Sequence, residues 1–123
     1  MNLPHVLLSG AVIGAAIEVH RQLGPGFLES VYGNALAIEL RARSIAFEHE
    51  LAVPILYRGN EVGLHRLDLF VEDRLVVELK AVREVLDLHF SVTRSYLHAV
   101  QGPHGLILNF AKGTLEVRRV FVR

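Results

Sequence analysis

Apolar residues recur at helical spacing in the N-terminal part of the chain and at strand spacing after residue 44. The helical part predicts two helices, Leu3–Leu23 and Leu28–Arg43, separated by the helix-breaking segment Gly24-Pro25-Gly26. The residues expected to form the core stripe of the second helix are Leu28, Val31, Ala35 and Ile38. Those expected on its adjoining face are Glu29, Tyr32, Gly33 and Leu36.

The rest of the chain is typical of strands, interrupted by one helical segment. The predicted strands are Ile45–Arg58, Val62–Val71, Leu75–Ala81, Gly105–Phe110 and Leu115–Val122. A helix is predicted over Leu88–Val100, between the third and fourth strands. The order α-α-β-β-β-α-β-β predicts an α/β (α+β) fold in which helices flank a mixed β-sheet. The chain of 123 residues suits one domain, 1–123.

Composition narrows the range of functions. The chain has no cysteine, which excludes disulfides, thiolate catalysis and cysteine-based zinc sites, and fits a cytoplasmic protein. Basic and acidic residues balance at 13 each, so no net positive field attracts nucleic acid. Any contact with nucleic acid therefore needs a local basic patch, a bound metal or a partner. The apolar run Val6–Ile17 is too short to span a bilayer, and we interpret it as part of a buried helix.

Candidate chemistry lies on the predicted hairpin of the second and third strands. Side chains alternate along a strand, so Glu78 and Lys80 share a face. If Glu72-Asp73-Arg74 forms the loop, Asp68 pairs directly with Glu78, with their Cβ atoms about 5 Å apart. Two opposed carboxylates repel unless a cation lies between them, either a divalent metal or, more weakly, Lys80. The alternative interpretation is a solvated hairpin face with a Glu78–Lys80 salt bridge.

Glu29 adds a third carboxylate from the first turn of the second helix. The helix dipole already favours an acid there, which is its structural explanation. If it projects over the face that bears Asp68 and Glu78, it completes an oxygen-rich site suited to Mg²⁺, with Mn²⁺ as a substitute. Tyr32 could direct its hydroxyl toward the same cleft. The seven histidines show no spacing that predicts a zinc site.

The segment Gly26-Phe27-Leu28-Glu29-Ser30-Val31-Tyr32 resembles the signature of the GxxExxY proteins, a family placed in the PD-(D/E)XK nuclease superfamily. The segments Val77–Val82 and Leu106–Phe110 are similar to its nuclease core and its late strand. The resemblance implies a restriction-endonuclease-like core, Mg²⁺ and phosphodiester cleavage in DNA or RNA. The catalytic residues that it implies are Glu29, Asp68, Glu78 and Lys80. The metal ligands that it implies are Asp68, Glu78, the backbone carbonyl of Leu79, and Glu29.

One departure from the family's pattern leaves an alternative open. The helix after the Glu-x-Lys strand usually carries a glutamine where this chain has Val92. The alternative function is a catalytically weak or inactive nuclease-fold module that binds nucleic acid or a protein partner. The candidates for substrate binding are Tyr32, Arg83 and Arg94, with Arg66, Arg118, Arg119 and Arg123 as further basic residues. Pairing through an exposed last strand would give a homodimer, and no membrane partner is expected.

Overall fold

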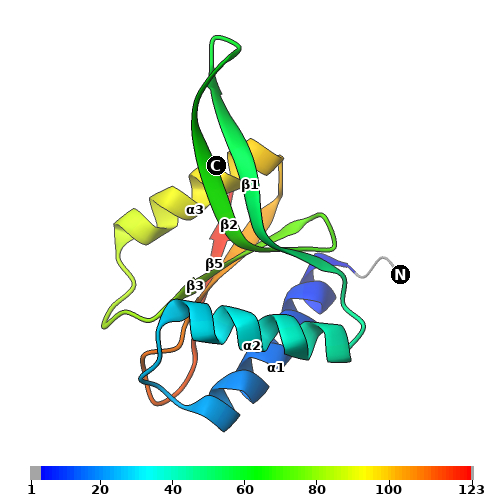
Figure 1. Cartoon of the computed structure of the whole chain (residues 1–123), viewed down its shortest axis with the longest axis vertical. Helices are drawn as coiled ribbons and strands as arrows, with labels where there is room; N and C mark the ends of the chain where they lie inside the picture. Colours follow the sequence, from blue (N-terminus) through cyan, green and yellow to red (C-terminus); the bar gives the residue numbers. More distant parts are fainter. Residues whose placement is uncertain (1–3, 123) are drawn as a thin grey trace.

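The computed structural model describes residues 4–122 and contains three helices and five strands (Figure 1). The elements are α1 (His5–Leu23), α2 (Glu29–Ala42), β1 (Phe47–Tyr57), β2 (Asn60–Val71), β3 (Leu75–Lys80), α3 (Asp87–Val100), β4 (His104–Asn109) and β5 (Glu116–Phe121). Their order confirms the predicted α+β fold. Leu3, the predicted start of the first helix, lies outside the described residues.

The five strands form one mixed sheet in the order β1-β2-β3-β4-β5. Only β3 and β4 run parallel, because α3 carries the chain from the end of one to the start of the other. Every residue of β4 is buried, as its apolar sequence predicted. β5 lies at one edge of the sheet, and Arg119 on this strand donates a 2.7 Å hydrogen bond to the Ser9 hydroxyl of α1.

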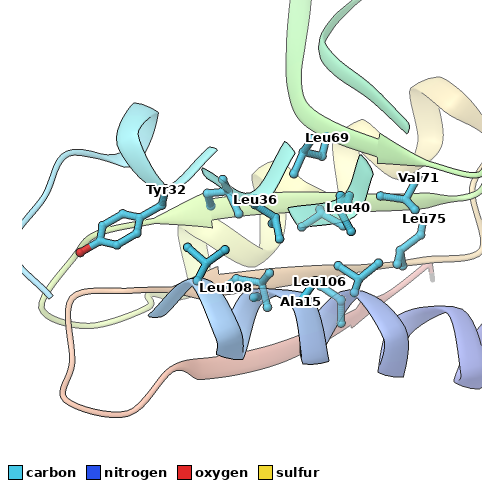
Figure 2. Close-up of a cluster of buried hydrophobic side chains, with 14 of the residues drawn as sticks. Ala15, Tyr32, Leu36, Leu40, Leu69, Val71, Leu75, Leu106 and Leu108 are labelled. Carbon is cyan, nitrogen blue, oxygen red and sulfur yellow. The ribbon is translucent and has the colours of Figure 1, made fainter. Parts of the chain in front are cut away.

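The helices divide between the two faces of the sheet. α1 and α2 lie together on one face (Figure 1) and share a hydrophobic core with it. Figure 2 shows how Tyr32, Leu36 and Leu40 of α2 meet the sheet residues of this core. α3 covers the other face, where Leu97 packs on a second core with Val76 of β3.

The buried stripe of α2 differs from the predicted one. Leu28 and Ile38 are 77% and 66% exposed. The buried residues of this helix are Tyr32, Gly33, Leu36, Ala37 and Leu40. Both sets have helical spacing and are offset around the axis, so periodicity alone does not select between them. Packing does, because the Tyr32 ring stacks on Phe110 with centroids 4.4 Å apart, and Gly33 allows the helix to approach β3.

α1 is long and apolar enough to cross a membrane by length and composition alone. Core helices of soluble proteins pass the same test, and this helix buries Val12, Ala15 and Ala16 completely against the sheet and α2. The small side chains allow close packing there. We therefore retain the interpretation of α1 as a core helix.

The strand β2 changes direction near Asp68, and this change creates the candidate site. Leu69 belongs to the core under α1 and α2, whereas Leu67 belongs to the core under α3, although simple alternation would place both on one face. Opposite Asp68, Glu50 of β1 adopts a left-handed φ of 57°. Beyond this point β1 and β2 continue as a hairpin that projects from the rest of the molecule (Figure 1).

Candidate active site

Asp68 and Glu78 meet where β2 and β3 separate. The two strands pair from Val71↔Leu75 to Leu69↔Val77, so the next residues in register are Asp68 and Glu78, as the predicted three-residue loop requires. The Asp68 Oδ2 atom accepts a 2.8 Å hydrogen bond from the Leu79 backbone N–H. The Glu78 Oε1 atom accepts a 3.3 Å hydrogen bond from the Asp68 backbone N–H. Each carboxylate therefore satisfies a backbone donor that the separating strands leave without a ladder partner.

Burial determines the charge state of Glu78, which is only 5% exposed. Loss of solvation, and then the negative charge of Asp68, raises the pKa of Glu78 to about 9, although the charge of Lys80 acts in the opposite direction. Burial, followed by the charges of Glu78 and Asp68, also raises the pKa of Tyr96 on α3. The phenol of Tyr96 therefore lies within electrostatic reach of both carboxylates. In the protein without a cation, Glu78 is a neutral acid at pH 7.

Lys80 follows Glu78 on the same face of β3 and is half-buried. Within residues 4–122 it forms no ion pair, so the alternative of a Glu78–Lys80 salt bridge is not present. Its neighbour in β4 is the fully buried Asn109. The Asn109 side chain exchanges hydrogen bonds of 2.8 and 3.0 Å with the backbone of Val82. This contact fixes the chain just after Lys80, whose charge acts on Glu78.

A cavity of about 140 Å³ lies beside Asp68. Its lining residues are Glu29, Ser30, Gly33, Asn34, His49, Glu50, Asp68 and Leu79. A Cβ atom at Gly33 would lie 3.4 Å from both the His49 ring and the Leu79 side chain, so the glycine keeps this side of the cavity open. The second helix, β1, β2 and β3 thus each contribute to one cavity.

Glu29 reaches this cavity from a different side than predicted. The expectation was a helix acid over the face that bears Asp68 and Glu78. α2 instead packs on the opposite face, the one to which Leu79 contributes, whereas alternation directs Glu78 toward α3. Asp68, at the gap between the strands, is the residue that borders both sides. The arrangement is the Asp68–Glu78 pair in the gap, with Glu29 and Glu50 as further carboxylates that line the cavity beside Asp68.

The described part of the chain contains no group of three His, Asp or Glu side chains close enough to hold a metal ion. The donors in the gap nevertheless suit a hard cation, because they are carboxylate and carbonyl oxygens. The Leu79 carbonyl points toward β2, since it lies on the same side of the strand as the N–H that donates to Asp68. Burial and the charge of Asp68 disfavour the ionised form of Glu78. A cation bound between the two carboxylates would stabilise that ionised form. The Asp68–Glu78 pair therefore fits Mg²⁺ or Mn²⁺, whereas Glu29 stands apart from the pair.

The prediction that Tyr32 contacts substrate needs a correction. Its side chain is fully buried, and its hydroxyl donates a 2.6 Å hydrogen bond to the Gly24 carbonyl. The same oxygen accepts a 3.3 Å hydrogen bond from the Phe27 N–H. Tyr32 therefore closes the turn before α2 and has no surface to offer a substrate. Because α2 begins directly after this turn, the turn also sets the position of Glu29, the first residue of the helix.

The remaining predicted residues lie around α3. Arg83 is exposed in the segment after β3, and Arg94 is half-buried on α3. Val92, at the position of the family's glutamine, is 36% exposed, and no hydrogen-bonding side chain replaces that amide at the same position. Arg83 remains a prediction as a substrate contact.

Sequence reasoning missed three residues near the site. His49 and Glu50 line the cavity from β1, and Tyr96 lies close to both carboxylates from α3. Nothing in the sequence of β1 singles out Glu50, because it reads as one more polar residue in an alternating strand. The sequence did point to Tyr96, because it lies one helical turn after Val92, the position at which this chain departs from the family's pattern.

Comparisons with known proteins agree with this fold. The family model of the PD-(D/E)XK nuclease superfamily matches residues 7–120. The chain therefore belongs to the PD-(D/E)XK nuclease superfamily. A similar solved structure, titled "Crystal structure of SSO0001", has a TM-score of 0.60 and 17% sequence identity, which shows a shared fold. The match covers 76% of this chain and 50% of that one. No curated protein gives a significant match.

Proposed function

We propose that the protein is a Mg²⁺-dependent nuclease that hydrolyses phosphodiester bonds in DNA or RNA. The observation that carries the proposal is the Asp68–Glu78 pair in the gap between β2 and β3, with Lys80 beside it and without an ion pair in the described chain. Membership of the PD-(D/E)XK nuclease superfamily supports it. The finer assignment to the GxxExxY proteins is also a proposal, and it rests on the resemblance of residues 26–32.

The positions of the residues support the following roles. Asp68, Glu78 and the Leu79 carbonyl would hold the cation, and Glu78 would have to release its proton to solvent to serve as a ligand. Bound there, a divalent cation would supply Lewis-acid charge at the phosphate and acidify a water molecule, and Mn²⁺ could replace Mg²⁺. Lys80 donates hydrogen bonds to the phosphate oxygens and stabilises their growing negative charge. Glu29, across the cavity, accepts a hydrogen bond from the attacking water.

A second candidate function is a nuclease-fold module that binds nucleic acid or a protein partner without cleaving it. Two observations favour it. The described residues contain no group of three His, Asp or Glu side chains placed to hold a metal ion, and Val92 replaces the amide that the family usually carries at its position. Incubation with an oligonucleotide in Mg²⁺ separates the two candidates. The nuclease would cleave the oligonucleotide, whereas the binding module would bind it and leave it intact.

Cleavage assays test the nuclease proposal. Purified wild-type protein, Asp68→Ala, Lys80→Ala and the surface control Arg21→Ala are incubated with labelled single- and double-stranded DNA and RNA in Mg²⁺, Mn²⁺ or EDTA. We expect Mg²⁺-dependent cleavage by the wild type and by Arg21→Ala, and a loss of about a hundredfold or more in the two site variants. Full cleavage by either site variant would assign the activity to another site or to a contaminant.

A further inference from the structure

Two arginines lie over one phenylalanine ring on the face of the sheet that α3 covers. The guanidinium carbon of Arg118, on β5, is 5.3 Å from the centroid of the Phe90 ring. The guanidinium carbon of Arg94, one turn after Phe90 on α3, is 5.9 Å from the same centroid. Asp87 and Ser91 complete the lining of this polar hollow of about 410 Å³. The ring thus holds two flat cations beside an open space.

The positive charge of this hollow is only partly neutralised, by Asp87 in its lining and by Glu116 beside it. Arg118 shares the carboxylate of Glu116 with Lys112, at 3.3 and 3.2 Å. Arg94 forms no ion pair with any described residue, and its buried Nε atom has no hydrogen-bond partner. The Arg94 side chain as a whole is half-buried and lines the hollow. Forked guanidinium groups of this kind bind phosphate oxygens well.

The strand register places this hollow beside the proposed active site. Glu78 of β3 pairs with Ile107 of β4, and Ile107 pairs with Arg118 of β5. Residues paired in this way point to the same face of a sheet, and Ile107 belongs to the core under α3. Two strand spacings separate Glu78 from Arg118, about 10 Å. A single nucleic-acid strand can therefore contact both places at once.

We propose that Arg94 and Arg118, held on the Phe90 ring, form a phosphate clamp for the nucleic-acid strand that the Asp68–Glu78 site cleaves. This inference rests on the proposed nuclease function. The clamp binds a backbone phosphate near the scissile one and reads no base, so it supplies affinity that is independent of sequence. A chain with zero net charge does not attract nucleic acid over long range. The clamp supplies the attraction locally, through the two guanidinium groups.

Fluorescence anisotropy with labelled single-stranded DNA tests the clamp. Binding is measured over a range of salt concentrations with Ca²⁺ in place of Mg²⁺, so that the readout does not depend on cleavage. The variants are Arg94→Gln/Arg118→Gln, the charge-preserving Arg94→Lys/Arg118→Lys, and the control Arg21→Gln. Arg21 pairs with Glu18 on α1, on the opposite side of the sheet. Thermal melting verifies that each variant is folded.

The double glutamine variant is expected to bind about tenfold more weakly and to lower the slope of log K against log salt by about 2. The lysine variant is expected to keep the slope but lose part of the affinity, and Arg21→Gln to match the wild type. Equal affinity and slope in the double glutamine variant and Arg21→Gln would overturn the clamp, as would a wild-type protein that binds no oligonucleotide. If the wild type binds but does not cleave, and the double variant weakens binding, the nuclease proposal fails and the clamp remains.

Discussion

The Asp68 carboxylate accepts a 2.8 Å hydrogen bond from the backbone N–H of Leu79, in the gap where β2 and β3 part. This bond places the carboxylate between two strands rather than on a face of the sheet. It also brings the negative charge of Asp68 next to the buried Glu78, whose pKa is raised to about 9. The separation of β2 and β3 therefore fixes the position of the Asp68 carboxylate. The charge of that carboxylate in turn helps to keep Glu78 protonated.

The raised pKa predicts that the metal-free protein loses stability as the pH rises. Between the ordinary pKa of 4.5 and the folded value of about 9, folded Glu78 keeps a proton that the unfolded chain has lost. The unfolded state binds fewer protons there, so the free energy of unfolding falls with increasing pH. Urea unfolding of wild type and Glu78→Gln from pH 5 to 9 measures this. We expect the wild type to lose stability relative to Glu78→Gln across the window, and a constant difference would contradict the assignment.

A glutamine at Glu29 is expected to reduce cleavage by about tenfold or more without changing the fold, because one of the carboxylates that line the cavity beside Asp68 would be lost. Glu39→Gln, on the same helix, removes only a surface ion pair with Arg43 and serves as the control. Single-turnover cleavage rates and melting temperatures of both variants check the prediction. Equal rates would exclude Glu29 from the reaction.

Removal of the Tyr32 hydroxyl is expected to lower stability and spare the chemistry. Tyr32→Phe loses the hydrogen bonds to Gly24 and Phe27, at a cost of about 1–2 kcal/mol in the free energy of unfolding. Because the side chain is buried, the KM for an oligonucleotide should stay unchanged at a temperature where the variant is fully folded. A raised KM in a variant of normal stability would restore the role of substrate contact.

Gly105 is expected to be intolerant of even one methyl group. A Cβ atom there would lie 2.8 Å from the Val76 carbonyl oxygen, in the parallel pair of β3 and β4. Relief of this overlap would cost about 1–3 kcal/mol of unfolding free energy. Gly10→Ala is the control, since its Cβ meets nothing within 4 Å in an exposed helical position and should stabilise α1 by about 0.5–1 kcal/mol. Chemical denaturation of both variants measures the contrast, and equal stabilities would refute it.

The fold was predictable because spacing and loop length leave few alternatives for its strands. The loop Glu72-Asp73-Arg74 fixes the register of β2 against β3, and that register was enough to pair Asp68 with Glu78. The face of α2 was not predictable, because Ile38 and Leu36 are equally apolar and only packing decides between them.

The side from which Glu29 approaches depends on which face of the sheet α2 covers, and this is a tertiary property. The same limit applies to Glu50. Its position opposite Asp68 follows from the pairing of β1 with β2, whose register shifts between Ile55 and Leu56. The short turn between Tyr57 and Asn60 therefore does not by itself place Glu50 opposite Asp68. The resemblance to a family suggested which residues are catalytic. The hydrogen bonds of Asp68 and Glu78 in the gap between β2 and β3 could be seen only in the structure.

Isothermal titration calorimetry with Mn²⁺ at pH 8 tests the central claim most directly, namely that Asp68 and Glu78 together form a divalent cation site. The wild type is predicted to bind one ion saturably and to release a proton from Glu78 as it does so, which appears as a dependence of the heat on the buffer. Asp68→Asn is predicted to lose this binding while it keeps its fold. Identical Mn²⁺ binding by the wild type and Asp68→Asn, or no binding by the wild type, would contradict the account.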